Sequence, residues 1–143
     1  MLAPMRYKKC GTKFIIRVDQ GEEIVATIKQ FCETTGIKLG SITGIGATNK
    51  ATIGLFDVAT KQYRSTELTG DYEIAPLLGT ISTKNGEPYL HIHVNLCDAR
   101  HRAVGGHLNA AVVSATFEGI IDVIDGEITR EFDERTGLNL LKL

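Results

Sequence analysis

The chain has 143 residues, 43% of them hydrophobic and 23% charged, so it is long enough to bury one core and too apolar to be disordered. Its formal net charge of −1 argues against a protein that binds nucleic acid mainly by neutralising phosphates. No apolar stretch reaches the length of a membrane span, and the N-terminal residues lack the apolar run of a signal peptide. We therefore expect a soluble, cytoplasmic protein with no membrane partner.

The first predicted elements are a strand at Phe14–Val18 and a helix that follows it. Asp19 and Glu22 have the spacing of a capping box, which predicts that Asp19 caps the helix. Apolar residues then recur at helical spacing through Glu33. Gly36 is expected to end this helix, the only long helix that the sequence predicts.

The rest of the chain predicts strands and turns. The strongest turn is Asn85-Gly86, a pair typical of tight hairpins, and Asn109–Ala111 is expected to form a short helical turn. Four leucines in the tail Thr136–Leu143 predict that it docks on its own core or on a neighbour. The expected strands are Lys38–Ala47, Ala51–Val58, Tyr63–Leu68, Tyr72–Leu78, Thr80–Thr83, Tyr89–Leu96, Val112–Ile124 and Glu127–Phe132.

These elements predict one α+β domain over residues 1–143, built mainly on an antiparallel or mixed sheet with one long helix and short helical turns. The three cysteines, Cys10, Cys32 and Cys97, are odd in number and widely spaced. They are therefore expected to be reduced thiols, which agrees with a cytoplasmic location.

Three histidines carry the main chemical signal. His91 and His93 are two residues apart in an alternating strand, so both side chains face the same side with Cα atoms roughly 6.5 Å apart. His107 follows Gly105-Gly106 and can close the set. Three imidazoles are a typical zinc shell with one position left for water or substrate, and the alternative is a plain solvated strand face. A divalent metal, with zinc as the best fit, is the predicted cofactor.

Two further residues near the histidines are weaker candidates. Cys97 lies on the same predicted strand face, where it could be a soft ligand, although a buried thiol is the simpler interpretation. His101 lies in a polar loop and is expected to be exposed. The glycine-rich segment Gly40–Gly46 lacks the lysine of a phosphate-binding loop and follows the helix, so it predicts strand bends and no nucleotide cofactor.

After the first strand and helix, the chain carries four further segments in a fixed order: Ser41–Ala47, Gly70–Ile74, Leu90–His93 and Gly105–Leu108. In this order they resemble the plants-and-prokaryotes-conserved (PPC) domain family, and the similarity runs from about Tyr7 to Phe132. The resemblance implies a stand-alone prokaryotic type, because the chain has no AT-hook. It also implies a homotrimer, a DNA-associated role and a metal at His91, His93 and His107.

One segment departs from the pattern of the plant members of this family. Their Gly-Arg-Phe-Glu-Ile-Leu segment is linked to partner binding, whereas here Asp71 replaces the arginine and Ala75 the final leucine. Contacts that need that arginine cannot be carried over to this chain.

Two functions compete at this point. The first is a DNA-associated or regulatory module with a structural or sensory metal, and the second is a metal-dependent small-molecule enzyme of the hydrolase type. An enzyme needs groups that move protons or orient the substrate, and Glu73, Glu118 and Asn95 are the candidates. The simpler interpretation is that Glu118 faces solvent or a subunit contact and that Asn95 is a plain surface residue. The basic clusters of the chain are small, so any binding to DNA is expected to be weak or indirect.

Overall fold

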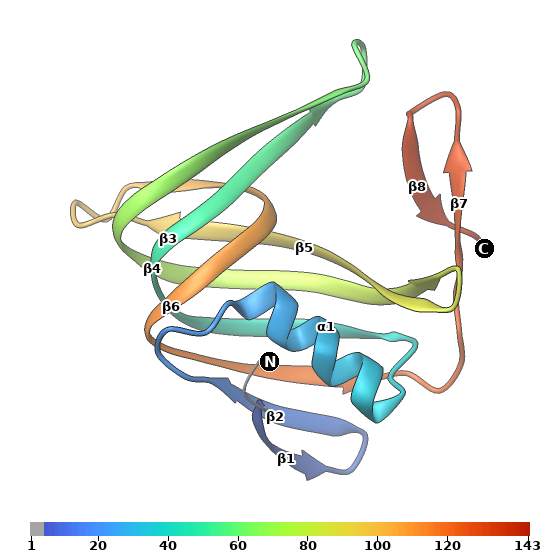
Figure 1. The fold of residues 1–143 in the computed structure, drawn as a ribbon, viewed down its shortest axis with the longest axis horizontal. Helices are drawn as coiled ribbons and strands as arrows, with labels where there is room; N and C mark the ends of the chain where they lie inside the picture. The colour runs from blue at the N-terminus through green and yellow to red at the C-terminus, as the bar shows by residue number, and fades with distance from the viewer. Residues whose placement is uncertain (1–4) are drawn as a thin grey trace.

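A long, bent antiparallel sheet carries one helix on one face and a small hairpin at one end (Figure 1). The computed structural model describes residues 5–143. The elements are β1 (Arg6–Cys10), β2 (Lys13–Val18), α1 (Ile24–Thr35), β3 (Gly40–Asp57), β4 (Gln62–Lys84), β5 (Glu87–Cys97), β6 (Ala103–Val123), β7 (Arg130–Asp133) and β8 (Leu138–Leu141). The strand order β1-β2-β6-β3-β4-β5, with β5 also paired to β6, confirms the α+β prediction of a single, mainly antiparallel domain.

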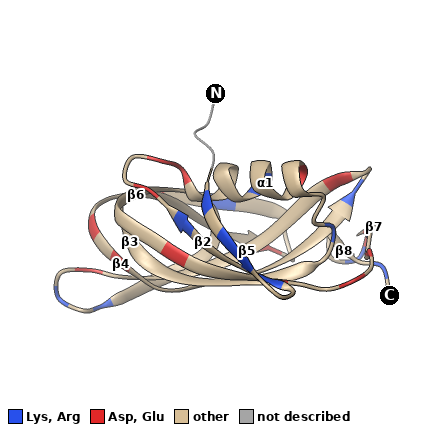
Figure 2. Cartoon of the chain, turned by 90° about the horizontal axis from the view of Figure 1, so that it is seen from below, with Lys and Arg blue, Asp and Glu red and all other residues tan. Residues whose placement is uncertain are grey.

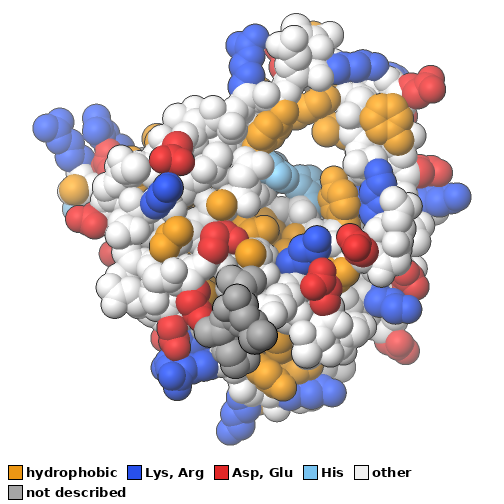
Figure 3. All heavy atoms as spheres, viewed as in Figure 1, with side chains coloured by type: hydrophobic (Ala, Val, Ile, Leu, Met, Phe, Trp, Pro, Cys, Tyr) orange, Lys and Arg blue, Asp and Glu red, His pale blue; other side chains and the backbone are white. Residues whose placement is uncertain are grey.

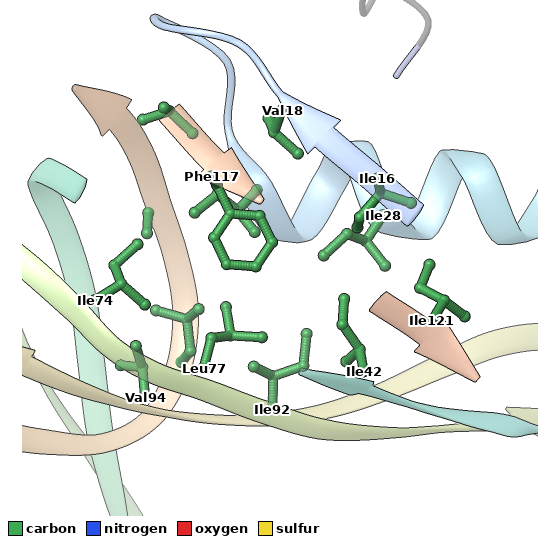
Figure 4. Packing of buried hydrophobic residues seen from close by; sticks show 14 of the residues in the cluster. Ile16, Val18, Ile28, Ile42, Ile74, Leu77, Ile92, Val94, Phe117 and Ile121 are labelled. Atoms are coloured by element: carbon green, nitrogen blue, oxygen red, sulfur yellow. The ribbon is translucent and has the colours of Figure 1, made fainter. Parts of the chain in front are cut away.

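The core lies between α1 and the sheet. Alternation in β2 buries Phe14, Ile16 and Val18, and α1 packs Ile28 and other apolar residues against the same face. Phe117 on β6 is fully buried among these side chains (Figure 4). The opposite face of the sheet is therefore the one left free for other contacts.

Gly44 on β3 makes room for the central aromatic ring. A Cβ atom at this position would lie 2.4 Å from Cζ of Phe117, which is closer than side chains tolerate. The glycine therefore reflects close packing, as the sequence predicted for this segment.

The helix begins later than the sequence predicted, so the assignment of Asp19 as its cap is wrong. Glu23 is the N-cap, and its carboxylate accepts hydrogen bonds from the backbone N–H groups of Val25 and Ala26. Asp19 instead forms ion pairs with two arginines, although Glu22 does accept a hydrogen bond from the Asp19 N–H. Gly36 ends the helix in a left-handed conformation, as predicted.

Several strands are longer than the sequence predicted, and β1 and β8 were not predicted. The predicted strands Lys38–Ala47 and Ala51–Val58 are one continuous strand, β3. The irregularities near Thr48 are bulges within it. The predicted helical turn at Asn109–Ala111 is also wrong, since this segment lies inside β6 and pairs with β3. The backbone N–H of Ala111 donates to the Glu23 carboxylate, which ties β6 to the start of α1.

The predicted hairpin at Asn85-Gly86 is confirmed and joins β4 to β5. Both residues have positive φ, 52° and 79°, as the tight turns between antiparallel strands require. The turn leaves the ends of β4 and β5 next to the C-terminal part of the chain (Figure 1).

The tail folds back on its own chain but does not dock on the core as predicted, since Leu140 and Leu141 are each 39% exposed and Leu143 is 99% exposed. Residues 130–141 form the C-terminal hairpin, made of β7 and β8. Lys84 Nζ at the end of β4 donates to Asn139 Oδ1 of the hairpin, and the Thr83 N–H donates to the carbonyl of Ile128, just before the hairpin. The hairpin thereby forms one wall of the site described below.

Charged residues of both signs are interspersed along the strands (Figure 2). Among residues 5–143, none of the helices is both long and apolar enough to cross a membrane. Several basic residues of β1 and β2 are already paired, since Arg6 and Arg17 contact Asp19 and Lys13 contacts Asp122.

Candidate metal centre

The three predicted histidines meet on the sheet face opposite α1. His93 on β5 is the direct cross-strand partner of His107 on β6, and His91 lies two residues before His93 on the same face. The Nε2 atoms of His91 and His93 are 3.1 Å apart. One nitrogen from each of the three rings can be chosen so that all lie within 4.8 Å of one another.

This arrangement fits a divalent ion. Two ligands at about 2.0–2.1 Å from a tetrahedral zinc lie roughly 3.3 Å from each other, close to the observed separation of the first pair. A metal ligand must be a neutral imidazole. Burial lowers the pKa of both His91 and His107, and the nearby His93 lowers each of them further. Both shifts favour the neutral form of the ring, which is the form that binds metal.

A pocket of about 770 Å³ opens above the histidines. Figure 3 shows the histidine rings at the bottom of a hollow that hydrophobic side chains border. One side of the pocket comes from β3 and β4, with Leu55, Phe56 and Tyr63, and the opposite side comes from Leu138–Leu141 of the C-terminal hairpin. None of the residues that line it within 5–143 is an aspartate or a glutamate.

Tyr63 covers one edge of the histidine cluster. Its ring meets the His107 ring edge to face at a centroid distance of 5.8 Å, and its hydroxyl donates to Asn109 Oδ1. This position depends on Gly54, because a Cβ there would lie 2.1 Å from the Tyr63 hydroxyl oxygen. The glycine therefore lets the tyrosine lie over the sheet beside the site.

Arg130 is the one cationic side chain in the described lining of the pocket. Its Nε donates to Ser82 Oγ at 2.8 Å and its Nη1 to the Asn139 carbonyl at 2.9 Å. The guanidinium carbon lies 4.5 Å from the centre of the Tyr89 ring. Burial lowers the pKa of Arg130, although an arginine stays protonated in proteins.

The other candidates lie away from the histidine cluster. Asn95 donates to the Ala75 carbonyl, and Cys97 does not join the metal-ligand group that the described residues form. His101 is exposed in the turn between β5 and β6, as predicted. Glu73 and Glu118 are exposed and do not line the pocket. Neither is therefore placed to transfer protons or orient a substrate at the histidines of its own chain.

Sequence reasoning missed Tyr63, Gly54 and Arg130. The first two lie far from the histidines along the chain, and only the pairing of β3 with β4 and β6 brings them there. Arg130 lies in the predicted strand Glu127–Phe132, and nothing in that strand's pattern indicates which part of the chain it contacts.

Solved structures similar to this chain come from bacteria and archaea. One is "a putative dna binding protein" from Bacteroides thetaiotaomicron, with a TM-score of 0.95 and 34% identity over 98% of each chain. Another is a "metal-containing protein" from Archaeoglobus fulgidus, with a TM-score of 0.86 and 35% identity over 99% of this chain and 100% of that one. A plant- and prokaryote-conserved (PPC) protein from Pyrococcus horikoshii has a TM-score of 0.84 and 31% identity, covering 100% and 97%.

A search among curated proteins gives no match. The family model of the Plants and Prokaryotes Conserved domain, abbreviated PCC or PPC, matches residues 5–125, which is most of the chain. The match and the likeness to solved structures confirm the resemblance that the sequence suggested. The chain belongs to the Plants and Prokaryotes Conserved domain family.

Proposed function

We propose that this protein binds one zinc ion at His91, His93 and His107 and uses the ion to bind a small molecule in the pocket above it. The observation that supports this proposal is the pocket itself, because the three imidazoles lie at its base rather than in closed packing. A shell of three protein ligands leaves a coordination position open, unlike the closed four-ligand shell of a structural zinc site. The role is therefore one of ligand sensing or ligand processing in the cytoplasm.

The size of the pocket supports a small-molecule ligand. Its volume of about 770 Å³ falls within the roughly 300–1,000 Å³ that is typical of small-molecule sites. Its walls combine apolar side chains such as Leu55 and Leu138 with a few polar groups, which is also typical. The description of the Archaeoglobus relative as a metal-containing protein supports a metal at this site.

Hydrolysis is the reaction that such a centre supports best. A zinc ion with an open position lowers the pKa of bound water to about 7. The described lining contains no carboxylate that could act as a general base, so this chain depends on water or on Tyr63 for proton transfer. Ligand binding is therefore the primary proposal, and hydrolysis is the second.

A role in DNA binding is the alternative that the name of the Bacteroides relative favours. The basic side chains of β1 and β2 give it little support, because three of the five, Arg6, Lys13 and Arg17, are each paired with a carboxylate. A regulator that acts through a partner or through a bound ligand remains compatible with the pocket.

We also propose a homotrimer assembled through the sheet face opposite α1. Ile15, Ile120 and Leu78 lie in one row across this face and are 44%, 42% and 51% exposed. The same row continues to His93 on β5, so an interface there would border the metal centre. Exposed apolar rows of this kind are typical of subunit contacts.

Light scattering tests the trimer. We expect three times the chain mass of 15.6 kDa for the native protein and for Val58→Asp, whose side chain is exposed at the end of β3 outside this row. Ile120→Asp is expected to lower the mass. A monomer mass for the native protein would reject the trimer.

A ligand screen tests the proposed function. Zinc-loaded and zinc-free protein would be compared in thermal-shift and hydrolysis assays against a library of small esters, amides, phosphates and acids. We expect stabilisation or turnover only with zinc bound, and loss of both in His93→Ala. Responses that persist without zinc would reject a role for the ion beyond structure.

A further inference from the structure

The C-terminal hairpin places a fixed cation beside the histidine cluster. Arg130 is the first residue of β7 and reaches Ser82 on β4, which is fully buried. Ser82 is the cross-strand partner of Tyr89 on β5, and the arginine lies over the Tyr89 ring. Tyr89 precedes His91 by two residues on the same strand, so their Cα atoms are roughly 6.5 Å apart. The guanidinium thus lies over the residue that neighbours His91 on the same face of β5.

The guanidinium keeps free donors. An arginine has five N–H groups, of which the Ser82 hydroxyl and the Asn139 carbonyl accept two in this structure. Within residues 5–143 no carboxylate forms an ion pair with it, although most arginines and lysines near β1 and β2 have one. The remaining N–H groups are therefore available to a ligand that enters the pocket.

The described lining of the pocket carries positive charge and no negative charge. Arg130 adds one positive charge and a divalent ion at the histidines would add two, while the described lining contains no acidic side chain to offset them. A pocket with two separated positive centres and apolar walls favours an anion over a neutral or cationic molecule. The walls that face this charge are Leu55 and Phe56 on one side and Leu140 and Leu141 on the other.

We propose that Arg130 binds the oxyanion group of a small anionic ligand whose other end lies at the metal and whose apolar part contacts the leucines of the C-terminal hairpin. This inference rests on the proposed function, because it names the ligand class of the same pocket. A planar guanidinium with unpaired N–H groups is suited to two parallel hydrogen bonds to a carboxylate or a phosphate. The hairpin is then the element that selects the ligand.

Isothermal titration of the zinc-loaded protein tests the proposal with three matched probes: phenylacetate, phenyl phosphate and the neutral phenylacetamide. We expect at least one anion to bind about tenfold or more tightly than the amide, since hydrogen bonds to charged groups are the stronger class. A preference between the two anions tells a carboxylate ligand from a phosphate ligand.

Three variants assign the effect to the arginine. Arg130→Gln is expected to lower anion affinity about tenfold or more and to leave the weak amide binding unchanged, and Arg130→Lys should be intermediate. Lys142→Gln is the matched control. It also removes a positive charge next to the hairpin, but Lys142 pairs with Glu131 and does not line the pocket. Zinc content and thermal unfolding are measured for each variant to show that the hairpin and the metal are retained.

The outcomes separate this inference from the proposed function. Equal binding of the amide and the anions by the native protein would overturn the role of Arg130 and leave a metal-dependent pocket intact, and this comparison needs no variant to fold. Unchanged anion affinity in a folded Arg130→Gln variant would do the same. Absence of zinc, or binding of none of the three probes, would overturn the proposed function together with this inference.

Discussion

His93 on β5 lies directly opposite His107 on β6, so the hydrogen-bonded register of two strands brings together histidines that are separated in the chain by an exposed turn. His91 joins them because it shares a strand face with His93. Rigid sheet elements hold all three rings, and sites built on such elements keep their geometry better than sites on loops. The register thus explains why the cluster forms without any ligand from a loop.

The first prediction compares the observed helix cap with the one that the sequence suggested. Glu23→Ala removes the cap and also the acceptor for the buried Ala111 N–H, so we expect the free energy of unfolding to fall by about 2–4 kcal/mol. Asp19→Ala breaks exposed ion pairs and should cost much less. Urea denaturation measures both variants, and an equal loss would contradict the assignment of the cap.

The second prediction concerns the glycine under Tyr63. Gly54→Ala places a methyl group where the tyrosine hydroxyl lies, so the ring must move away from His107. We expect a loss of about 1–3 kcal/mol in stability, typical of an overpacked site. Tyr63→Phe keeps the ring and loses only the hydrogen bond to Asn109, so it is the milder change. Calorimetric unfolding that shows no loss for Gly54→Ala would contradict the packing.

The third prediction follows from the environments of two cysteines. Burial, together with the charge of Glu33, raises the pKa of the Cys32 thiol from 9.0 to about 12, whereas Cys10 is exposed. A disulfide reagent at pH 8 should therefore modify Cys10 rapidly and leave Cys32 unmodified until the protein unfolds. Mass spectrometry of the labelled peptides gives the answer, and rapid labelling of Cys32 in the folded protein would be the contrary result.

The same shift predicts the direction of a pH effect on stability. The unfolded thiol of Cys32 ionises near pH 9, while the folded thiol stays protonated to about pH 12. Between these values the unfolded state binds fewer protons, so this contribution is complete below pH 9 and is lost as the pH rises. Cys32→Ala should show a flatter stability curve than the native protein over pH 9–11 in urea denaturation.

The strand pattern and the histidine pair were predictable from the sequence because both depend on local alternation. Leu90 to Leu96 alternates apolar and polar residues, and this alternation placed His91 and His93 on one face correctly. The helix also followed from its periodicity, but its first residue did not. Asp19 and Glu23 are both able to cap, and the choice depends on Ala111, which is 88 positions from Glu23 in the chain.

The walls of the pocket were not predictable, since they depend on long-range pairing. β3 is one strand of 18 residues whose pairing with β6 has three register shifts, and these shifts decide that Gly54 lies opposite His107. Arg130 reaches the site only because the tail folds back on the end of β4. Neither effect leaves a periodic pattern in the sequence.

The fourth prediction is that this protein alone binds duplex DNA weakly or not at all. Its net charge is −1, and several basic residues of β1 and β2 are neutralised by carboxylates, so it can displace few counterions from the DNA. Fluorescence anisotropy with a labelled duplex at physiological salt should give no saturation at micromolar protein. Sub-micromolar binding that weakens with salt would reverse this conclusion and support a direct regulator.

The central claim is that His91, His93 and His107 jointly bind one zinc ion, and elemental analysis of zinc-loaded, dialysed protein tests it most directly. We predict about one zinc per chain for the native protein and for the control His101→Ala, whose side chain lies exposed outside the cluster. His93→Ala should retain almost none, with its fold intact by circular dichroism. A native protein without zinc, or a His93→Ala variant with as much zinc as the native protein, would contradict the account.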